Sequence, residues 1–296
     1  KKEILNLKKK YQDIFINNLK DINEGSINTN LKKVYQLNNK FEKIKKEESI
    51  DKIIKFTIYY GVIPFSILAR HAFVAENLLR SLIRLKVINL KDVDNFKSSF
   101  ETVTSKFITD CELLSKNSIT FNSFKKKYGH LRPGTYDINS KNYSSFNKDF
   151  FIKKKSSSKL KKIYNLQKIK KRKINKILKK NNIQMNSNEL FDYLKKSIIS
   201  REYSKFIFTK NVDLILKKIA NVAQKYKLSK KQISFFKVKD IIRINNNRYS
   251  KKKLKQEMYL NMEKYNIHLN IKLPMLLVDP TGVDVIPFQV SSPNFI

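Results

Sequence analysis

Apolar residues recur every three or four positions along most of the chain, a spacing that places them on one face of an α-helix. Over residues 3–22 and 31–48 this pattern predicts two amphipathic helices, separated by Gly25 and its polar neighbours. We expect these two helices to pack against each other as an N-terminal hairpin within residues 1–50.

The strongest helix prediction covers residues 61–84. Arg70, His71 and Arg80 stand out there among apolar neighbours and are candidate substrate-binding residues. Glu76 lies four positions before Arg80, so the two side chains can pair on the helix surface. The simpler interpretation is an ordinary helix face that carries salt bridges of small energetic value.

Further helical periods predict that the rest of the chain is mainly α. Residues 90–116 are expected to form one helix, and a short helix capped by Thr120 or Asn122 follows. Ser187 is a plausible cap for a long helical stretch over 189–226, with a potential break near residues 209–211. Short helices after Ser229 and over 250–265 complete the helical part.

Two segments have a different composition. Residues 153–180 are rich in lysine and contain no Asp or Glu, although apolar residues at helical spacing still allow an amphipathic helix. From residue 271 onward, four prolines exclude a helix and β-branched residues favour extended backbone. The expected architecture is therefore a helical hairpin at 1–50, a multi-helix domain at 51–270 that contains the lysine-rich segment, and an extended, partly β tail at 271–296.

Composition supports a folded protein but leaves its charge ambiguous. Apolar residues make up 41% of the 296 residues, enough for a sizeable core. The net charge of +38 is compatible with binding to nucleic acid, because lysines release condensed counterions from phosphate backbones. Lysine, asparagine and isoleucine are all abundant while glycine is scarce, a bias typical of A/T-rich coding, so much of the charge is also explained as solvated surface.

Cysteine usage and hydropathy suggest a cytoplasmic protein. Cys111 is the only cysteine, which excludes an internal disulfide and a CxxC metal site, and its helical context favours a small core residue. The longest apolar run, residues 56–69, is interrupted by Gly61 and Pro64 and is too short to span a bilayer. We therefore expect no membrane partner and no metal site in the chain.

The loop at residues 128–138, Tyr-Gly-His-Leu-Arg-Pro-Gly-Thr-Tyr-Asp-Ile, concentrates the candidate chemistry. Pro133-Gly134 predicts a type II turn, with glycine at the position of positive φ. Arg132 precedes proline and is therefore restricted to extended backbone. A constrained loop between helices would present four side chains together: His130, Arg132, Tyr136 and Asp137.

No Walker A loop, GxGxxG, HExxH or GxSxG motif occurs in the chain. The loop sequence nevertheless resembles the Tyr-Gly-His-Arg-type motif of the phosphoenolpyruvate-synthase-like and rifampin-phosphotransferase-like enzymes. Three further stretches look like the same helical region of those enzymes: residues 64–84, residues 201–209 continuing to 229, and residues 273–277 with 293–296. The resemblance covers most of residues 55–296. The departures are Leu131, where better-known members often have arginine, and residues 135–137, which replace the usual glutamate context.

The resemblance implies a phosphate relay. An ATP-grasp domain, which uses ATP and Mg²⁺, would phosphorylate a mobile histidine on a swivelling domain, and that histidine would pass the phosphoryl group to a small acceptor. This chain contains neither domain and no cofactor of its own, so it would supply the acceptor pocket and be inactive alone. The catalytic candidates are His130 and Asp137, and the substrate-binding candidates are Arg132, Tyr136, Arg70, His71, Arg80 and Lys205.

Three alternatives remain open at this point. His130 and Asp137 are equally compatible with a purely structural role that ties down the turn by hydrogen bonds to the backbone. The charge and the lysine-rich segment favour a basic RNA-binding or ribosome-associated protein. Finally, the helical domain is also compatible with an architectural role, in which it spaces two catalytic domains and binds no ligand.

Overall fold

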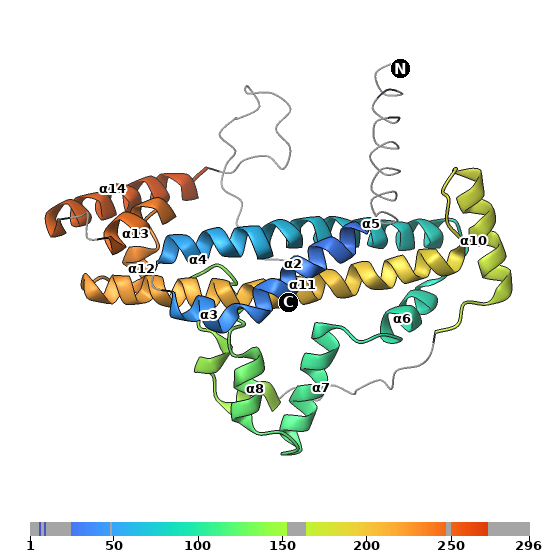
Figure 1. Ribbon diagram of the computed structural model, residues 1–296, viewed down its shortest axis with the longest axis horizontal. Coiled ribbons are helices and arrows are strands. Elements are labelled where there is room, and N and C mark those ends of the chain that lie inside the picture. Colours follow the sequence, from blue (N-terminus) through green and yellow to red (C-terminus); the bar gives the residue numbers. More distant parts are fainter. Residues whose placement is uncertain are drawn as a thin grey trace. The chain divides into compact units, whose positions relative to one another are not determined.

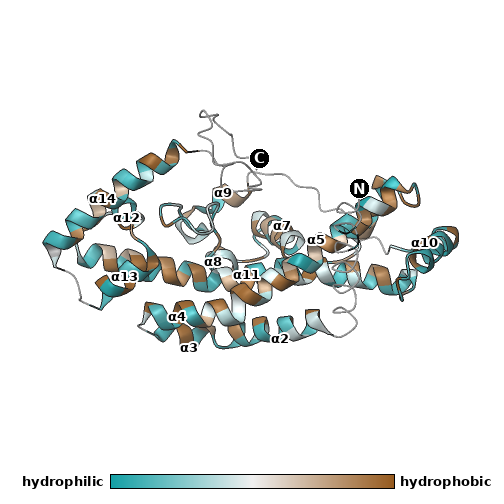
Figure 2. Ribbon diagram, turned by 90° about the horizontal axis from the view of Figure 1, so that it is seen from above, coloured by the Kyte–Doolittle hydropathy of each residue, from teal (hydrophilic) through white to brown (hydrophobic). Residues whose placement is uncertain are grey.

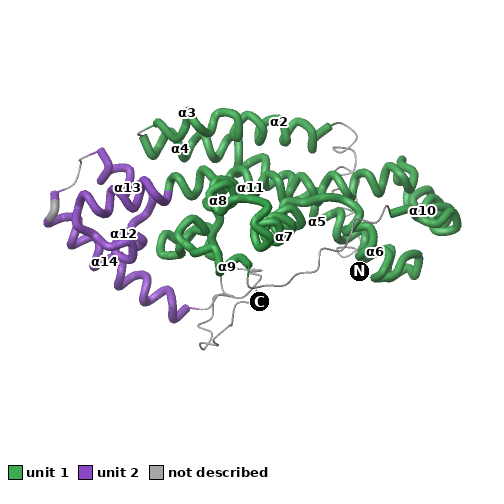
Figure 3. Tube along the Cα trace, turned by 90° about the horizontal axis from the view of Figure 1, so that it is seen from below, with its two compact units in different colours: residues 1–215 green, residues 216–296 purple. Residues whose placement is uncertain are grey.

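The computed structural model describes residues 25–47, 49–152, 164–246 and 250–271, together with Asn6 and Lys9. These residues contain helices and loops but no β-strand, which confirms the mainly α prediction (Figure 1). The chain divides into unit 1, residues 1–215, and unit 2, residues 216–296 (Figure 3). This division falls inside one long helix, and the sequence pattern does not predict it.

The helices have the following bounds. Unit 1 contains α2 Ser26–Asn39, α3 Phe41–Lys46, α4 Ile50–Thr57, a π-helical turn η1 Ile58–Val62, α5 Ile63–Arg84, α6 Leu90–Ser98, α7 Val103–Ser115, α8 Phe121–Tyr128, a 3₁₀ turn η2 Tyr143–Ser145, α9 Lys148–Ile152 and α10 Lys168–Lys180. Helix α11 Ser187–Lys225 begins in unit 1, and unit 2 continues with α12 Lys230–Ile233, α13 Val238–Asn245 and α14 Lys251–Leu269.

Two long helices form the centre of unit 1. Helices α4 and α5 join through η1 into one continuous helix, Ile50–Arg84, which lies beside α11 and α2 (Figure 1). The three meet at Gly61, where a Cβ atom would lie 2.7 Å from the Phe208 Cβ and 2.9 Å from the Leu37 Cδ2. Glycine is therefore required for the close approach of this helix to α11.

The single helix expected at 90–116 is wrong, because the structure breaks it into α6 and α7. Thr102 begins a new helix: its side chain accepts a hydrogen bond from the Ser105 N–H, and the Ser105 hydroxyl accepts one from the Thr102 N–H. Such reciprocal capping satisfies two N–H groups at once and favours a fresh start over continuation. The apolar period continues across the break, because Phe100 between the two helices is also buried.

Helix α11 has no break near residues 209–211. The Thr209 hydroxyl donates to the Phe206 carbonyl at 3.0 Å, so this polar residue is satisfied inside the helix. The cap is also one position from the expected one, because the Asn186 side chain, rather than that of Ser187, accepts from the backbone N–H groups of Asn188 and Glu189.

Several other expectations are corrected or lie outside the described residues. Helix α2 begins at Ser26, so most of the supposed separator after Gly25 is helical. Most of residues 3–22, residues 153–163 and the tail at 272–296 are outside the described part. Glu76 does not pair with Arg80 in this structure but with Lys97 of α6, at 2.7 Å.

Unit 2 contains a small apolar core contributed by α12, α13 and α14. Ser229 caps α12 as expected, and Leu254 and Met258 of α14 are buried. The Tyr226 hydroxyl donates to the Ile244 carbonyl at 3.0 Å, which fixes the end of α11 to α13.

By length and composition, one described helix could cross a membrane: Ile50–Arg84. It is longer than the apolar run considered above, because Gly61 and Pro64 do not interrupt it. One third of its most apolar 18-residue window (33%) is buried within the protein. A core helix of a soluble protein passes the same test, so this feature is weak evidence for a membrane span.

Candidate functional site

An aromatic cluster supports the loop that carries the candidate residues. Tyr128, the last residue of α8, is only 1% exposed and its ring lies against Phe107 of α7 and Phe206 of α11. Its hydroxyl donates to the Asp110 carboxylate at 2.8 Å. Burial, and secondarily this carboxylate, raise the pKa of Tyr128 far above its usual value, so the donor keeps its proton. The loop therefore starts from a fixed position.

The loop does not contain the type II turn expected at Pro133-Gly134. Gly134 does not have a positive φ, and the observed turn starts at Gly134 instead of Arg132, because the Asp137 N–H donates to the Gly134 carbonyl at 3.0 Å. The absence of a side chain still matters, because a Cβ on Gly134 would lie 3.1 Å from the Ser140 Cβ. The Ser140 hydroxyl accepts from the Gly134 N–H at 3.1 Å across this narrow gap.

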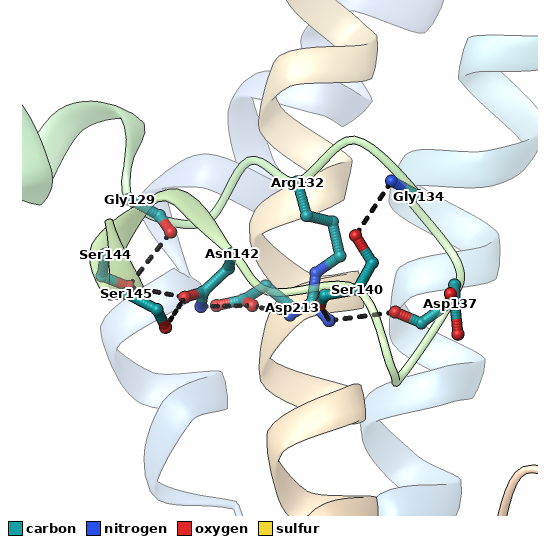
Figure 4. Close-up of polar contacts among 9 residues, drawn as sticks. All are labelled: Gly129, Arg132, Gly134, Asp137, Ser140, Asn142, Ser144, Ser145 and Asp213. Carbon is teal, nitrogen blue, oxygen red and sulfur yellow. Dashed lines mark hydrogen bonds and ion pairs between the residues drawn. The ribbon is translucent and has the colours of Figure 1, made fainter. Parts of the chain in front are cut away.

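Arg132 fastens the loop to α11 (Figure 4). One terminal nitrogen, Nη2, is ion-paired with the Asp213 carboxylate, and both side chains are almost fully buried. The other, Nη1, donates to the carbonyls of Asp137 at 3.3 Å and Ser140 at 3.2 Å. Because both terminal nitrogens hold the protein's own oxygens, Arg132 in this arrangement stabilises the loop.

Asn142 completes this polar network. Its side-chain N–H donates to the same Asp213 oxygen at 2.9 Å, while its side-chain carbonyl lies 3.0 Å from the hydroxyls of Ser144 and Ser145. The Tyr143 N–H also donates to the Leu131 carbonyl at 2.7 Å, which joins the two ends of the segment 131–143. The segment is thus rigid for identifiable reasons, as a positioned binding loop needs to be.

His130 is held against α11 by its ring. The Nε2 atom lies 3.1 Å from the Phe206 carbonyl, and the two rings contact edge to face with centroids 4.8 Å apart. A carbonyl oxygen can only accept, so Nε2 carries the hydrogen and a neutral imidazole has its lone pair on Nδ1. His130 is therefore oriented by the helix that also anchors Arg132.

A pocket of about 390 Å³ lies between the loop, the start of α7 and one face of α11. His130 and Arg132 both line it, together with Lys205, Glu202 and the Phe206 ring. The Glu202 carboxylate accepts from the Thr104 N–H at 3.1 Å and so satisfies one of the free N–H groups in the first turn of α7. The pocket is also lined by the His130 ring and by Lys205, whose side chain is exposed.

The remaining candidates lie elsewhere. Asp137 and Tyr136 are exposed at the far end of the loop, and the Asp137 carboxylate accepts from the Asn139 N–H at 2.8 Å in a local turn. On α5, Arg70 and Arg80 are exposed and do not line the pocket.

His71 of α5 is 4% exposed. The Nε2 atom of its ring lies within hydrogen-bond distance of the Ser26 hydroxyl, at 3.2 Å, and its backbone carbonyl accepts from the Tyr193 hydroxyl at 3.0 Å. Among the eight sequence candidates, the pocket thus brings together only His130, Arg132 and Lys205.

Three residues that build the site are not predicted from the sequence: Asp213, Asn142 and Glu202. For Glu202 and Asp213 the sequence does contain a signal, which is their spacing along a helix. Positions 202, 205, 206, 209 and 213 follow the spacing of a single helix face, and this face of α11 is the one that meets the loop. Asn142 had no such signal, because only the folded loop brings its amide to Asp213.

The described residues contain no group of three or more His, Cys, Asp or Glu side chains arranged to hold a metal ion. Comparison with family models, with curated proteins and with solved structures gave no match. The family resemblance therefore rests on the loop sequence and the three accompanying stretches alone.

Proposed function

We propose that this chain is the acceptor-binding helical domain of an ATP-dependent phosphotransferase that relays phosphate through a mobile histidine. The observation that carries the proposal is the 390 Å³ pocket beside His130, lined also by Arg132 and Lys205. The loop sequence that resembles phosphoenolpyruvate-synthase-like enzymes forms one wall of this pocket.

We propose different roles for these three residues. Lys205 is the exposed cation and would attract the phosphoryl group, because phosphoryl transfer depends mainly on positioning and on positive charge near the transferred group. Arg132 would act as a positioning residue, since its terminal nitrogens hold Asp213 and two loop carbonyls. Asp137 and Tyr136 would contribute indirectly, through the shape of the loop.

His130 would serve as the general base. In the proposed step, the N–P bond of the phosphohistidine breaks as the acceptor oxygen forms an O–P bond. The acceptor's hydroxyl proton passes to Nδ1 of His130, and the mobile histidine leaves as a neutral imidazole after taking a proton from solvent. A neutral imidazole is the side chain that most often serves as a general base in enzymes.

The partners follow from the same mechanism. An ATP-grasp domain and a swivelling phosphohistidine domain would supply the phosphoryl group, and ATP with Mg²⁺ would bind there and not in this chain. The acceptor is a small molecule with a nucleophilic oxygen. The coding sequence on either side of this chain should encode both domains.

The test follows label from [γ-³²P]ATP in the protein that carries this chain together with both domains. His130→Ala should leave phosphorylation of the mobile histidine intact and slow transfer to acceptor at least about 100-fold, the usual contribution of a general base. Lys205→Ala should also leave that phosphorylation intact and slow transfer, because it removes positive charge near the transferred group. Arg80→Ala is the matched control for lost positive charge, because Arg80 is exposed on α5 and does not line the pocket.

Undiminished transfer in both pocket variants would remove the site assignment and leave an architectural role for the domain. Absence of both flanking domains from the coding sequence would overturn the relay itself.

A further inference from the structure

Helix α10 of unit 1, Lys168–Lys180, is strongly positively charged. Eight of its 13 residues are Lys or Arg and none is Asp or Glu. In Figure 2 hydrophilic residues dominate this helix. Six of its cations are exposed: Lys168, Arg172, Lys173, Lys176, Lys179 and Lys180.

The exposed cations form a continuous face. Positions 168, 172, 176 and 180 are each four residues apart, so they follow one side of the helix at a rise of about 6 Å per step. Positions 173 and 179 widen this row on either side. Like charges at this spacing repel one another, so the free helix is electrostatically unfavourable and any bound polyanion would relieve it.

Few of these charges are neutralised by the protein. Within the described residues, the one ion pair of α10 joins Lys170 to Asp92 of α6, at 2.7 Å, and Lys170 is not one of the exposed six. Neighbouring exposed residues add more positive charge, because Lys86 and Lys91 border the same end of α6 as Lys170.

The packing of α10 distinguishes between two kinds of polyanion. A basic amphipathic helix binds a membrane by burying its apolar face among the lipids. In α10 that face is already used: Ile174 and Leu178 are 0% and 4% exposed in the core of unit 1, and Ile177 packs against the same core. Ile169 alone among its apolar residues is exposed, so the helix offers charge without an apolar surface to insert.

We propose that the exposed face of α10 binds the phosphodiester backbone of nucleic acid without sequence specificity. Such binding needs a row of cations and no base-reading side chains. The proposal is independent of the acceptor pocket, whose lining residues include none from α10.

The test measures binding of the chain to a fluorescein-labelled 20-nucleotide oligouridine and to a 20-base-pair DNA duplex, by fluorescence anisotropy at several salt concentrations. The variant Arg172→Gln/Lys173→Gln/Lys176→Gln/Lys179→Gln should bind at least about 10-fold more weakly near 0.1 M salt. For the single strand, the slope of log affinity against log salt should flatten by about 0.7 for each phosphate that the variant no longer neutralises.

The matched control is Lys239→Gln/Lys252→Gln/Lys255→Gln/Lys264→Gln, which removes the same charge from exposed positions of unit 2. It should keep most of the affinity. Circular dichroism checks that both variants fold, and the α10 variant should fold at least as well because it loses like-charge repulsion. Equal losses in both variants, no salt-dependent binding, or tighter binding to anionic phosphatidylserine vesicles than to nucleic acid would overturn the proposal.

Discussion

At the scale of single residues, the site depends on one buried carboxylate. Asp213 accepts from Arg132 and from Asn142, and through them it holds both ends of the segment 132–142. Arg132 Nε is buried and has no hydrogen-bond partner among the described residues, so the guanidinium relies on its other two nitrogens. A buried charge that loses its partner costs far more than the intact pair contributes.

Asp213→Ala should therefore lower the free energy of unfolding of unit 1 by about 3–5 kcal/mol. Asp137→Ala, which removes an exposed carboxylate from the same loop, should cost less than about 1 kcal/mol. Urea denaturation followed by tyrosine fluorescence measures both. The double variant Arg132→Met/Asp213→Leu should be less destabilised than Asp213→Ala, and a larger loss in the double variant would contradict this account of the pair.

At the scale of the elements, helix packing depends on one glycine. The Gly61 Cβ position is blocked by the Cβ of Phe208, an atom fixed to the α11 backbone, as well as by the more mobile Leu37 side chain. Gly61→Ala should destabilise unit 1 by roughly 1–3 kcal/mol, the usual cost of overpacking. Asn77→Ala on the same helix is exposed and should be nearly neutral.

Leu37→Ala should not restore the stability lost in Gly61→Ala, because it relieves only the softer of the two contacts. Thermal unfolding of the single and double variants measures this. Full rescue by Leu37→Ala would show that α5 and α11 can separate easily.

The contact between α6 and α10 should weaken in acid. Burial alone would raise the pKa of Asp92, but hydrogen bonds from Lys170 and from the Asn89 N–H outweigh it and hold this pKa below its usual value of 3.8. A depressed carboxyl pKa contributes stability above the unfolded-state pKa, and this contribution is lost as pH falls through the folded-state value.

The stability difference between the wild-type chain and Asp92→Asn should accordingly be constant from pH 7 to about 5 and shrink below pH 4. Unfolding free energies measured along this pH series provide the test. A difference that stays the same down to pH 2.5 would show that the ion pair does not stabilise the fold.

The elements also show what sequence patterns can and cannot predict. Periodicity identifies α5, α11 and α14, because a long apolar stripe reports burial directly. Periodicity does not predict the break between α6 and α7 at residues 99–102. The apolar spacing continues across these residues, although the capping side chains of Thr102 and Ser105 start a new helix there. The neighbours of Gly134 predict a positive φ, whereas its actual requirement is space for Ser140. That requirement depends on residues that meet only in the folded loop.

The same limit applies to the site. His130, Arg132 and Lys205 are recognisable in the sequence as chemically capable residues, and the structure places all three at one pocket. Arg70, His71 and Arg80 are equally capable by residue type but lie on α5, where His71 packs against α2 and α11. Residue chemistry therefore predicts the candidates, and only the tertiary contacts distinguish among them.

At the scale of the whole molecule, we propose two different uses for parts of the net charge of +38. Lys205 lines the pocket proposed to hold a phosphorylated group, while the cations of α10 form the exposed face proposed to bind a polymer. These two functions should be separable, since a variant of either surface leaves the other unchanged.

The chain has only three histidines, which makes the central claim directly measurable. His130 lines the pocket, His71 is buried on α5, and His268 is exposed near the end of α14. With ¹³C-labelled histidine, a two-dimensional spectrum reports each ring separately while inorganic phosphate is added at constant pH and ionic strength.

If the pocket binds phosphate, we expect a saturable shift of the His130 signal alone, and we expect this shift to be absent in Lys205→Ala. Parallel shifts of all three signals, or no shift of His130 up to about 10 mM phosphate, a weak-binding limit near −3 kcal/mol, would contradict phosphate binding at this pocket.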